Sequence, residues 1–263
     1  MKKILLLGGT GLAGQAIYRA LQDKYRIVRT AGHHDVKCGW RVSVEEPERL
    51  LTILNTEDPD IVISSIRGDF QAQMQFHESL ADWLSGKEKR LLFLSTSNVF
   101  DGDLNRPHTE TDLPAPCSDY GIFKYDCETM LQKKLPGQIL IFRPSMIWAP
   151  KCPRLSSLIQ CSCSGKPSRT WQNFHINITL AEQLGWYADY VLGHGFTGIF
   201  HVGTRDTIDY CDFDTMVCKA MHIQIPDFEV EKMTQTSFQA VIPARPEIPD
   251  RLQLTVSEVL KKL

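Results

Sequence analysis

Three scarcities narrow the classes of protein to which this chain of 263 residues can belong. Its apolar runs, such as Ile4–Leu7, are far shorter than the ~20 residues that a membrane-spanning helix needs. Its eight cysteines are too few for a disulfide-stapled scaffold and form no CxxC pair, which favours a reduced, cytoplasmic protein. With 29 basic against 31 acidic side chains, no excess of positive charge exists to attract nucleic acid or a membrane surface. We therefore expect neither partner.

Three local patterns resemble features that the rest of the sequence does not support. Two lysines precede Ile4–Leu7 as in a signal peptide, but this apolar run ends after four residues, so a buried first strand is the better interpretation. Cys161, Cys163 and His175 could in principle hold zinc, but their spacing matches no established ligand pattern. The adjacent His33–His34 is interpreted as a solvated turn. We therefore expect no metal site.

Short apolar runs alternate with amphipathic stretches through the first 145 residues. Strands are expected at 3–7, 26–29, 61–65, 91–95 and 139–143, with a weak edge strand at 36–38, and helices at 12–23, 47–56, 71–85 and 120–135. The strands are almost wholly apolar, as in sheets covered by helices on both faces. The alternation predicts an α/β, Rossmann-like, doubly wound parallel sheet.

Prolines interrupt the chain after residue 143, and a stretch rich in Ser and Cys follows. We expect substrate-binding loops between residues 148 and 177. Regular structure is expected to return as a helix at 178–192, a strand at 198–202, a helix at 210–221 and a short closing helix. This part predicts a small C-terminal α/β lobe.

A glycine-rich segment joins the first expected strand to the first expected helix. Its glycines satisfy G-x-G-x-x-G in the strand–turn–helix context that a dinucleotide-binding fingerprint requires. Glycine permits the tight turn and a close approach of the backbone to a pyrophosphate, and the helix N-terminus offers free N–H groups. The candidate cofactor-binding residues here are Gly8, Thr10, Gly11, Leu12 and Gly14.

The end of the second strand indicates which dinucleotide is bound. An acidic residue there would hold the ribose hydroxyl of NAD, whereas a basic residue favours the 2′-phosphate of NADP. Arg29 occupies this place and no carboxylate precedes Asp35. NADP is therefore favoured, with NAD as the alternative, unless Arg29 merely solvates the strand end.

Tyr120 and Lys124 lie four residues apart, on one face of an expected helix. Reduction of a carbonyl requires a proton for the developing alkoxide, and a nearby cation makes a tyrosine phenol a better donor. A hydroxyl at the end of a neighbouring strand would orient the substrate oxygen, and Ser95–Thr96–Ser97 supplies three. The pattern indicates a reductase site.

Three segments together resemble the extended short-chain dehydrogenase/reductase family: 8–14, 95–102 and 120–124. Within that family, the order and spacing are most similar to the dTDP-4-dehydrorhamnose reductase-like sugar nucleotide reductases, including Glu110–Thr111–Asp112. The likeness extends over nearly the whole chain. Two departures are Ser97 in place of an aspartate in the S-T-D motif, and Ser64–Arg67 where relatives have N-A-A.

The resemblance implies an NADP-dependent reductase that acts on a keto sugar nucleotide. Thr96, or else Ser95, would polarise the carbonyl, Tyr120 would donate the proton, and Lys124 would hold the nicotinamide ribose and lower the tyrosine pKa. Further cofactor contacts would come from Ser64, Ser65 and Arg143, and further substrate contacts from Ser95, Ser97, Arg67 and Trp148. Two alternatives stay open: Arg67 could form a surface salt bridge instead, and Trp148 could pack in the small lobe.

Two other functions fit the same scaffold. One is a nucleotide-sugar epimerase, and the other is a noncatalytic, cofactor-binding regulatory subunit, which the intact Thr96, Tyr120 and Lys124 disfavour. We expect an NAD(P)-binding domain at 1–147, with returning segments at 175–205, and a mainly substrate-binding lobe at 148–263. The expected assembly is a monomer or a homodimer.

Overall fold

The computed structural model describes residues 1–32 and 39–263. The expected edge strand at 36–38 and the pair His33–His34 lie outside these described residues. Within them, no helix has both the length and the apolar character needed to span a membrane. Residues 3–7 form the first strand, four of whose five residues are buried.

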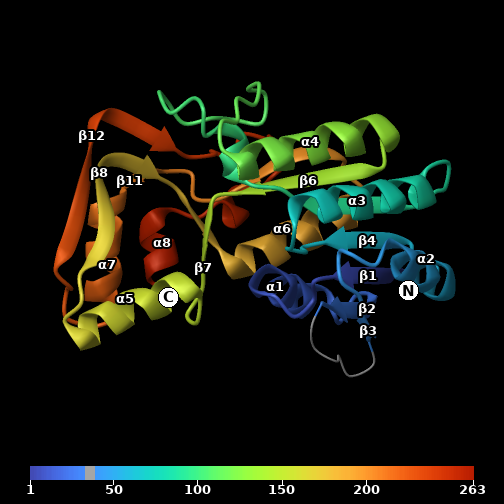
Figure 1. Ribbon diagram of the computed structural model, residues 1–263, viewed down its shortest axis with the longest axis horizontal. Helices are drawn as coiled ribbons and strands as arrows, with labels where there is room; N and C mark the ends of the chain where they lie inside the picture. The colour runs from blue at the N-terminus through green and yellow to red at the C-terminus, as the bar shows by residue number, and fades with distance from the viewer. Residues whose placement is uncertain (33–38) are drawn as a thin grey trace.

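A seven-stranded sheet forms the larger part of the molecule, and every neighbouring pair of its strands is parallel (Figure 1). Its order is β10-β6-β5-β4-β1-β2-β3. The strands are β1 (Lys3–Leu7), β2 (Arg26–Ala31), β3 (Trp40–Arg41), β4 (Ile61–Ser64), β5 (Arg90–Leu94), β6 (Ile139–Pro144) and β10 (Gly198–Val202). The strand order reverses between β1 and β4, which is where open α/β sheets bind ligands at their carboxyl ends.

Helices cover both faces of this sheet. One face packs against α2 (Pro47–Glu57), α3 (Phe70–Leu84) and α4 (Asp119–Lys134), and the other against α1 (Leu12–Leu21) and α6 (Ala181–His194). Alternate residues of β1 divide between the two cores, with Leu5 in one and Leu6 in the other. This is the doubly wound α/β fold that the alternating sequence pattern predicts, and the prediction is confirmed.

A smaller part, on the left of Figure 1, contains a three-stranded sheet of order β11-β8-β12. Its elements are α5 (Pro153–Ser164), β8 (Ser168–Ile176), β11 (Ile208–Asp209), α7 (Tyr210–Ala220), β12 (Phe228–Gln239) and α8 (Val256–Leu260). A two-stranded sheet of β7 (Met146–Trp148) and β9 (Ile178–Leu180) connects it with the larger part, and η1 (Ser97–Phe100) and η2 (Asp250–Leu252) are short 3-10 helices. A separate apolar core that includes Trp148 and Phe213 supports these elements.

The expectation of loops between residues 148 and 177 is wrong. This stretch contains α5 and the whole of β8. Pro153 stands in the first turn of α5, where its missing N–H costs nothing, and Gly165 ends the helix in the left-handed conformation at φ 65°. The helix expected at 178–192 is also corrected, because its first three residues form β9.

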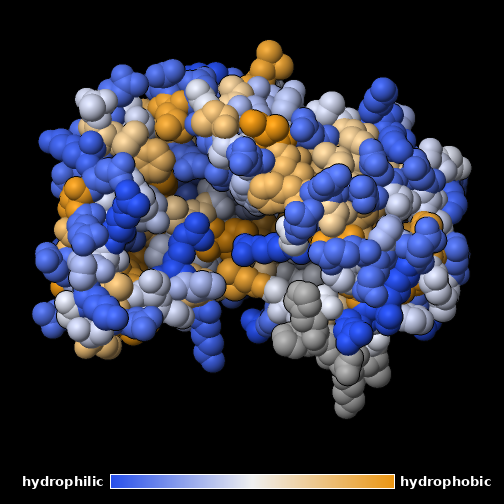
Figure 2. All heavy atoms as spheres, in the orientation of Figure 1, coloured by the Kyte–Doolittle hydropathy of each residue, from blue (hydrophilic) through white to orange (hydrophobic). Residues whose placement is uncertain are grey.

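The face drawn in Figure 2 is hollowed between the two parts, with hydrophobic residues on the floor of the hollow. The carboxyl ends of the parallel strands β4 and β5 lead to the residues that follow them, Ser65 and Ser95. Chemistry-bearing residues of the sequence motifs follow these strand ends.

Candidate active site

The glycine turn after β1 has no space for side chains. Gly8 adopts φ 74°, and a Cβ added there would lie 2.7 Å from the carbonyl oxygen of Ser65. A Cβ added at Gly14 would lie 2.2 Å from the carbonyl oxygen of Gly8. The turn is closed by a hydrogen bond from the Gly11 N–H to the Gly8 carbonyl, 3.1 Å long. These glycines hold the backbone in a compact turn that a bulkier residue would open.

The first turn of α1 is open to an anion. Its N-cap is Gly11, and no side chain caps the N–H groups that follow. Thr10 is exposed, and its carbonyl accepts a hydrogen bond from the Gln15 side chain at 2.6 Å. Leu12 packs at the edge of the small-lobe core. Unpaired N–H groups at a helix N-terminus bind phosphate, so this cradle fits a dinucleotide diphosphate.

Arg29 lies beside the glycine turn. A Cβ added at Gly9 would come within 3.0 Å of the Arg29 Cβ, so the side chain leaves β2 directly over the turn. Its guanidinium carbon lies 4.2 Å from the centre of the Tyr18 ring, on α1. The residue is half-buried, and it lies beside this turn with the positive charge that the sequence predicts for a 2′-phosphate contact.

The two serines at the end of β4 differ in orientation. Ser64 is buried, and its Oγ lies 2.8 Å from Nε2 of His77. Burial, together with the positive charge of Lys124, lowers the pKa of His77 to about 3, so this imidazole is neutral at neutral pH. Ser65 donates a hydrogen bond to the Leu7 carbonyl at 2.9 Å and stays half-buried beside the glycine turn. Of the two, Ser65 is placed to meet a ligand.

Asp101 and Ser118 fix the start of α4 against the turn that follows β5. The Asp101 carboxylate accepts the backbone N–H groups of Cys117 at 2.6 Å and Ser118 at 3.2 Å, and the Ser118 hydroxyl also donates to it. That hydroxyl in turn accepts the Gly121 N–H at 3.0 Å, as an N-cap. A Cβ at Gly121 would lie 2.4 Å from the Asn98 carbonyl oxygen, so glycine is needed for this approach.

Tyr120 at the start of α4 lies near Thr96, which follows β5. Burial raises the pKa of Tyr120, while the positive charge of Arg67 and a hydrogen bond with Thr96 act in the opposite direction. Thr96 Oγ1 is further held by Asn98, whose side-chain oxygen it reaches at 3.0 Å. About 39 % of Tyr120 remains exposed, so the phenol borders both the protein interior and the solvent. A phenol beside a hydroxyl at a strand end suits proton transfer to a substrate oxygen.

Lys124 lies one helical turn beyond Tyr120, as its spacing predicts, but deep in the protein. Its side chain is 5 % exposed, and its Nζ donates to the Leu94 carbonyl at 3.0 Å. Nζ also lies 4.6 Å from the centre of the Phe93 ring. Burial lowers the pKa of Lys124 to about 8. The role of Lys124 as the cation that assists the tyrosine stays a prediction; the positive charge of Arg67 also favours ionisation of the phenol by lowering its pKa.

The remaining candidates for substrate contacts near Tyr120 are two buried serines and one exposed arginine. Ser95 and Ser97 flank Thr96 and are buried, and the Ser95 Oγ has no hydrogen-bond partner among the described residues. Arg67 is exposed just beyond β4 and forms no ion pair within the described ranges, so its salt-bridge alternative is not observed. Ser95 and Ser97 follow the end of β5, and Arg67 follows the end of the adjacent strand β4.

Arg143 and Trp148 lie away from this group. Arg143 is 1 % exposed and binds the Glu128 carboxylate at 2.6 Å through Nη2 and 3.0 Å through Nε. Trp148 is also 1 % exposed and packs edge-to-face on Phe213, with 5.0 Å between ring centres. In this arrangement neither side chain is open to a ligand, and Trp148 has the core-packing role that the sequence left as an alternative.

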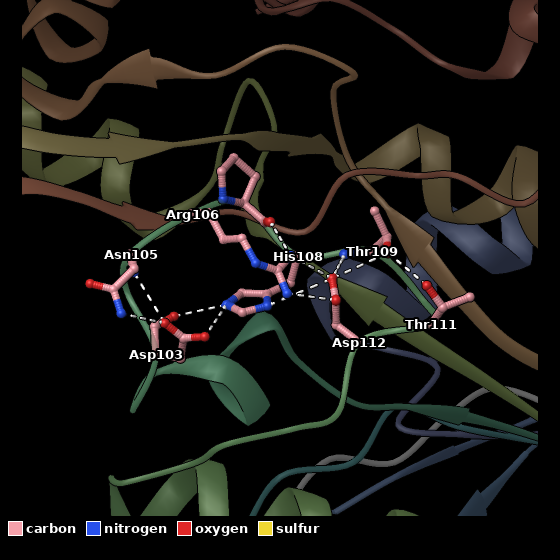
Figure 3. Close-up of polar contacts among 8 residues, drawn as sticks. Asp103, Asn105, Arg106, His108, Thr109, Thr111 and Asp112 are labelled. Carbon is pink, nitrogen blue, oxygen red and sulfur yellow. Dashed lines mark hydrogen bonds and ion pairs between the residues drawn. The ribbon is translucent and has the colours of Figure 1, made fainter.

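A polar network stabilises the loop between η1 and α4, and Figure 3 shows it around Asp112. The Asp112 carboxylate accepts two hydrogen bonds from Arg106, at 2.7 and 2.9 Å, and one from the Thr109 N–H at 2.7 Å. These contacts hold the pKa of Asp112 well below its usual range. Glu110 accepts the His201 and Ala244 N–H groups at 2.9 and 3.0 Å and so ties the loop to the C-terminal segment.

The sequence interpretation missed two residues that position the reactive side chains, but not the reactive side chains themselves. Asp101 and Ser118 were not singled out, although a serine before a helical Tyr–Lys pair is a recognisable N-cap. Within residues 1–32 and 39–263, no three His, Cys, Asp or Glu side chains gather closely enough to hold a metal ion.

Comparison with known protein families identifies the family of this chain. A family model described as the RmlD substrate binding domain matches residues 1–249. The chain belongs to the RmlD substrate binding domain family. The predicted likeness to extended short-chain dehydrogenases/reductases is thereby confirmed at the level of family and fold.

Two curated relatives of this chain differ in name. Methionine adenosyltransferase 2 subunit beta of Mus musculus is 28 % identical over 161 residues, which cover 53 % of this chain and 46 % of the mouse protein. The Escherichia coli dTDP-4-dehydrorhamnose reductase is 27 % identical over 160 residues, which cover 56 % of this chain and 52 % of that protein. The chain thus spans about half the length of these curated relatives.

Solved structures of dTDP-4-dehydrorhamnose reductases share the whole fold. The Yersinia enterocolitica structure has a TM-score of 0.82 at 21 % identity and covers 100 % of this chain and 98 % of its own. The Bacillus anthracis structure, which is in complex with NADP, has a TM-score of 0.81 at 14 % identity. It covers 99 % of this chain and 98 % of its own. At these identities the likeness establishes the fold.

Proposed function

We propose that this protein is an NADP-dependent reductase of a keto sugar nucleotide, in which the nicotinamide supplies the hydride and Tyr120 the proton. The observation that carries the proposal is the closeness of Tyr120 to Thr96, with Lys124 one helical turn further along α4, at the carboxyl edge of the sheet where the glycine turn after β1 also lies. The family membership and the E. coli relative's name support the substrate class, and the B. anthracis complex supports NADP.

The cofactor would rest on the glycine turn. The N–H groups at the start of α1 would receive its diphosphate, because Gly11 leaves them uncapped and Gly14 keeps the helix close. Arg29 would pair with the 2′-phosphate, Ser65 would contact the cofactor beside the turn, and Lys124 would hold the nicotinamide ribose. NAD is the alternative cofactor, and it would leave Arg29 without this partner.

Tyr120 and Thr96 would act on the substrate carbonyl. Thr96 would orient the carbonyl oxygen by a hydrogen bond, and Tyr120 would release its proton to that oxygen. Asp101 and Ser118 hold the start of α4 and therefore fix the phenol relative to the hydroxyl before substrate arrives. Ser95, Ser97 and the other polar residues around the hollow would contact the sugar.

The proposal extends to the organisation of the chain. Residues 1–147, with returning segments at 175–205, would bind the cofactor, and residues 148–263 would mainly bind the nucleotide sugar. Helix α6 supports this division, because its buried face packs in the same core as α1 and the large sheet. A cytoplasmic location and a monomer or homodimer complete the proposal.

A noncatalytic regulatory subunit is the second candidate. The 28 % identity with a protein named as a subunit, methionine adenosyltransferase 2 subunit beta, favours it. The meeting of Tyr120 with Thr96 favours the reductase, because a subunit that only binds cofactor has no use for a proton donor.

Turnover of NADPH with a panel of 4-keto sugar nucleotides tests the reaction. Tyr120→Phe removes the proton donor and should lower kcat by about 100-fold or more, whereas NADPH affinity stays unchanged. Tyr125→Phe, on the same helix, is the matched control and should retain turnover. If Tyr120→Phe turns over like the wild type, the assignment of the acid is wrong.

NADPH and NADH affinities test the cofactor. Arg29→Ala should weaken NADPH binding by about 10- to 100-fold, because a charge-assisted contact to the phosphate is lost, and leave NADH binding nearly unchanged. Arg49→Ala, an exposed change on α2, controls for loss of positive charge alone. Equal weakening of both dinucleotides by Arg29→Ala would contradict the 2′-phosphate contact.

A further inference from the structure

Arg143 and Glu128 form an ion pair whose two charges both lie out of contact with water. Arg143, in β6, is 1 % exposed, and its guanidinium binds the fully buried Glu128 carboxylate of α4 through Nη2 at 2.6 Å and through Nε at 3.0 Å. Removing one partner of such a pair is costly, but replacing both by apolar side chains of similar volume is often neutral or stabilising. Stability alone therefore does not explain the pair, and its geometry deserves a separate account.

Glu128 belongs to the face of α4 that carries the side chains proposed to react. Tyr120, Lys124 and Glu128 follow one another at four-residue spacing, so they lie in one row along the helix. Figure 1 shows α4 lying along β6, the strand of Arg143. Lys124 Nζ donates to the Leu94 carbonyl on β5 at 3.0 Å, and β5 is the strand paired with β6. Two polar contacts thus attach this row to two adjacent strands.

Arg143 also contacts η1, the turn that begins at the other reactive group. Its guanidinium carbon lies 5.1 Å from the centre of the Phe100 ring, within the range of a cation–π contact. Phe100 is the last residue of η1, and Thr96 is the N-cap of the same turn. The Phe100 ring is itself held, because it stacks on His108 with 4.3 Å between ring centres. One guanidinium therefore joins the helix of Tyr120 to the turn of Thr96.

The guanidinium of Arg143 has a single charged partner. His201 is paired with Arg143 on the adjacent strand β10, but burial, together with the positive charge of Arg143, lowers the pKa of His201 to about 3, so this imidazole is neutral. Within residues 1–32 and 39–263, Glu128 is the one carboxylate that pairs with Arg143, and Nη1 has no hydrogen-bond partner. The bidentate contact therefore has one bound arrangement, whereas a helix packed only by apolar contacts can slide or rotate.

We propose that Arg143 is a positioning residue, which holds α4 and η1 together so that the Tyr120 phenol and the Thr96 hydroxyl keep one relative position. The inference rests on the proposed function, and it replaces the cofactor contact that the family resemblance implies for Arg143. The residue acts through Glu128 and Phe100, and its own guanidinium neither gains nor loses a proton in the reaction. Displacing either reactive group by about 1 Å can lower the rate about 100-fold, so this contact matters more for turnover than for folding.

Replacement of both partners separates positioning from stability. Arg143→Met combined with Glu128→Leu keeps most of the buried volume but removes the bidentate contact, so this double variant should unfold at nearly the wild-type urea concentration. Its kcat with NADPH and a keto sugar nucleotide should nevertheless fall about 10- to 100-fold, while the KM for NADPH changes less than about twofold. Asp82→Asn combined with Lys134→Gln removes an exposed ion pair between α3 and the far end of α4, and this matched control should keep the wild-type kcat.

The Tyr120 phenol reports its own position without any turnover. Carbon-13 labelled tyrosine gives one NMR signal for each ring, and Tyr120→Phe identifies the signal of interest. In the ligand-free protein, this signal should shift and broaden in the double variant, because α4 no longer has one fixed position, and it should stay unchanged in the matched control. Arg143→Lys keeps the charge but loses the bidentate contact, so it should change both the signal and kcat to a smaller extent.

Both measurements have to change for the inference to stand. A folded double variant that keeps either the wild-type kcat or the wild-type Tyr120 signal overturns it, because the positioning acts through that phenol and serves turnover. If the double variant does not fold, Arg143→Lys decides by the same two measurements.

These outcomes are distinguishable from failure of the proposed function. If the wild type reduces no keto sugar nucleotide, the reductase proposal fails, and the Tyr120 signal of the double variant still decides whether Arg143 positions α4. If the wild type turns over and the variants do so equally well, the positioning role fails alone.

Discussion

Alanine at Gly14 should destabilise the protein, although alanine ordinarily stabilises a helix. Gly14 lies within α1, where replacing glycine by alanine normally gains about 1 kcal/mol. Here the added Cβ would lie 2.2 Å from the Gly8 carbonyl oxygen and 2.9 Å from the Gly9 Cα. Both are backbone atoms that cannot rotate away, so the glycine turn has to open. Overpacking of this kind costs about 1–3 kcal/mol, which exceeds the helical gain.

Gly193→Ala is the matched control. Gly193 is also helical, in α6, and an added Cβ there meets no atom within 4 Å. This change should raise the free energy of unfolding by about 0.5–1 kcal/mol. Both variants receive the helical gain, so they should differ by the overpacking cost of about 1–3 kcal/mol, which for a chain of this size corresponds to roughly 2–12 °C in Tm.

Urea unfolding followed by circular dichroism measures the difference, and NADPH titration measures its consequence for the proposed cofactor site. Gly14→Ala should unfold at lower urea than the wild type and bind NADPH more weakly, whereas Gly193→Ala should bind it normally. A Gly14→Ala protein as stable as Gly193→Ala would show that the turn does not pack as described, and the argument for the phosphate cradle would fail with it.

Two further predictions concern buried charges. Glu128→Gln leaves the buried Arg143 without a counter-charge and should cost about 3–5 kcal/mol in urea unfolding, whereas Glu231→Gln, in an exposed ion pair, should cost less than about 1 kcal/mol; equal costs would contradict the buried pair. Burial raises the pKa of Asp214 from 3.8 to about 7, against the hydrogen bond from Thr170. The folded protein therefore holds this proton more tightly than the unfolded chain, and stability is lost as pH rises from about 4 to 7. Asp214→Asn should remove this part of the loss, so its stability relative to the wild type should increase over that interval; a constant difference would refute the assignment.

The central sheet could be predicted because local runs of apolar residues in the sequence mark its buried strands. Strands buried on both faces need consecutive apolar residues, and the runs in β1, β4, β5 and β6 are of that kind. Elements of the small lobe lack such runs. Seven of the 12 residues of β12 are exposed and one is buried, and the segment is a strand because β8 pairs with it. Its hydrogen bonds come from a distant segment, so no local pattern predicts it.

The residues of the candidate site likewise differ in whether the sequence alone could predict their roles. The amino-acid sequence by itself determined the glycine turn and the spacing of Tyr120 and Lys124, because turn geometry and helical periodicity act over a few residues. Only the tertiary structure decided that Arg143 pairs with Glu128 and that Trp148 lies in a core. Burial and charge depend on which strand ends and helices come together, and that is a property of long-range packing rather than of neighbouring residues.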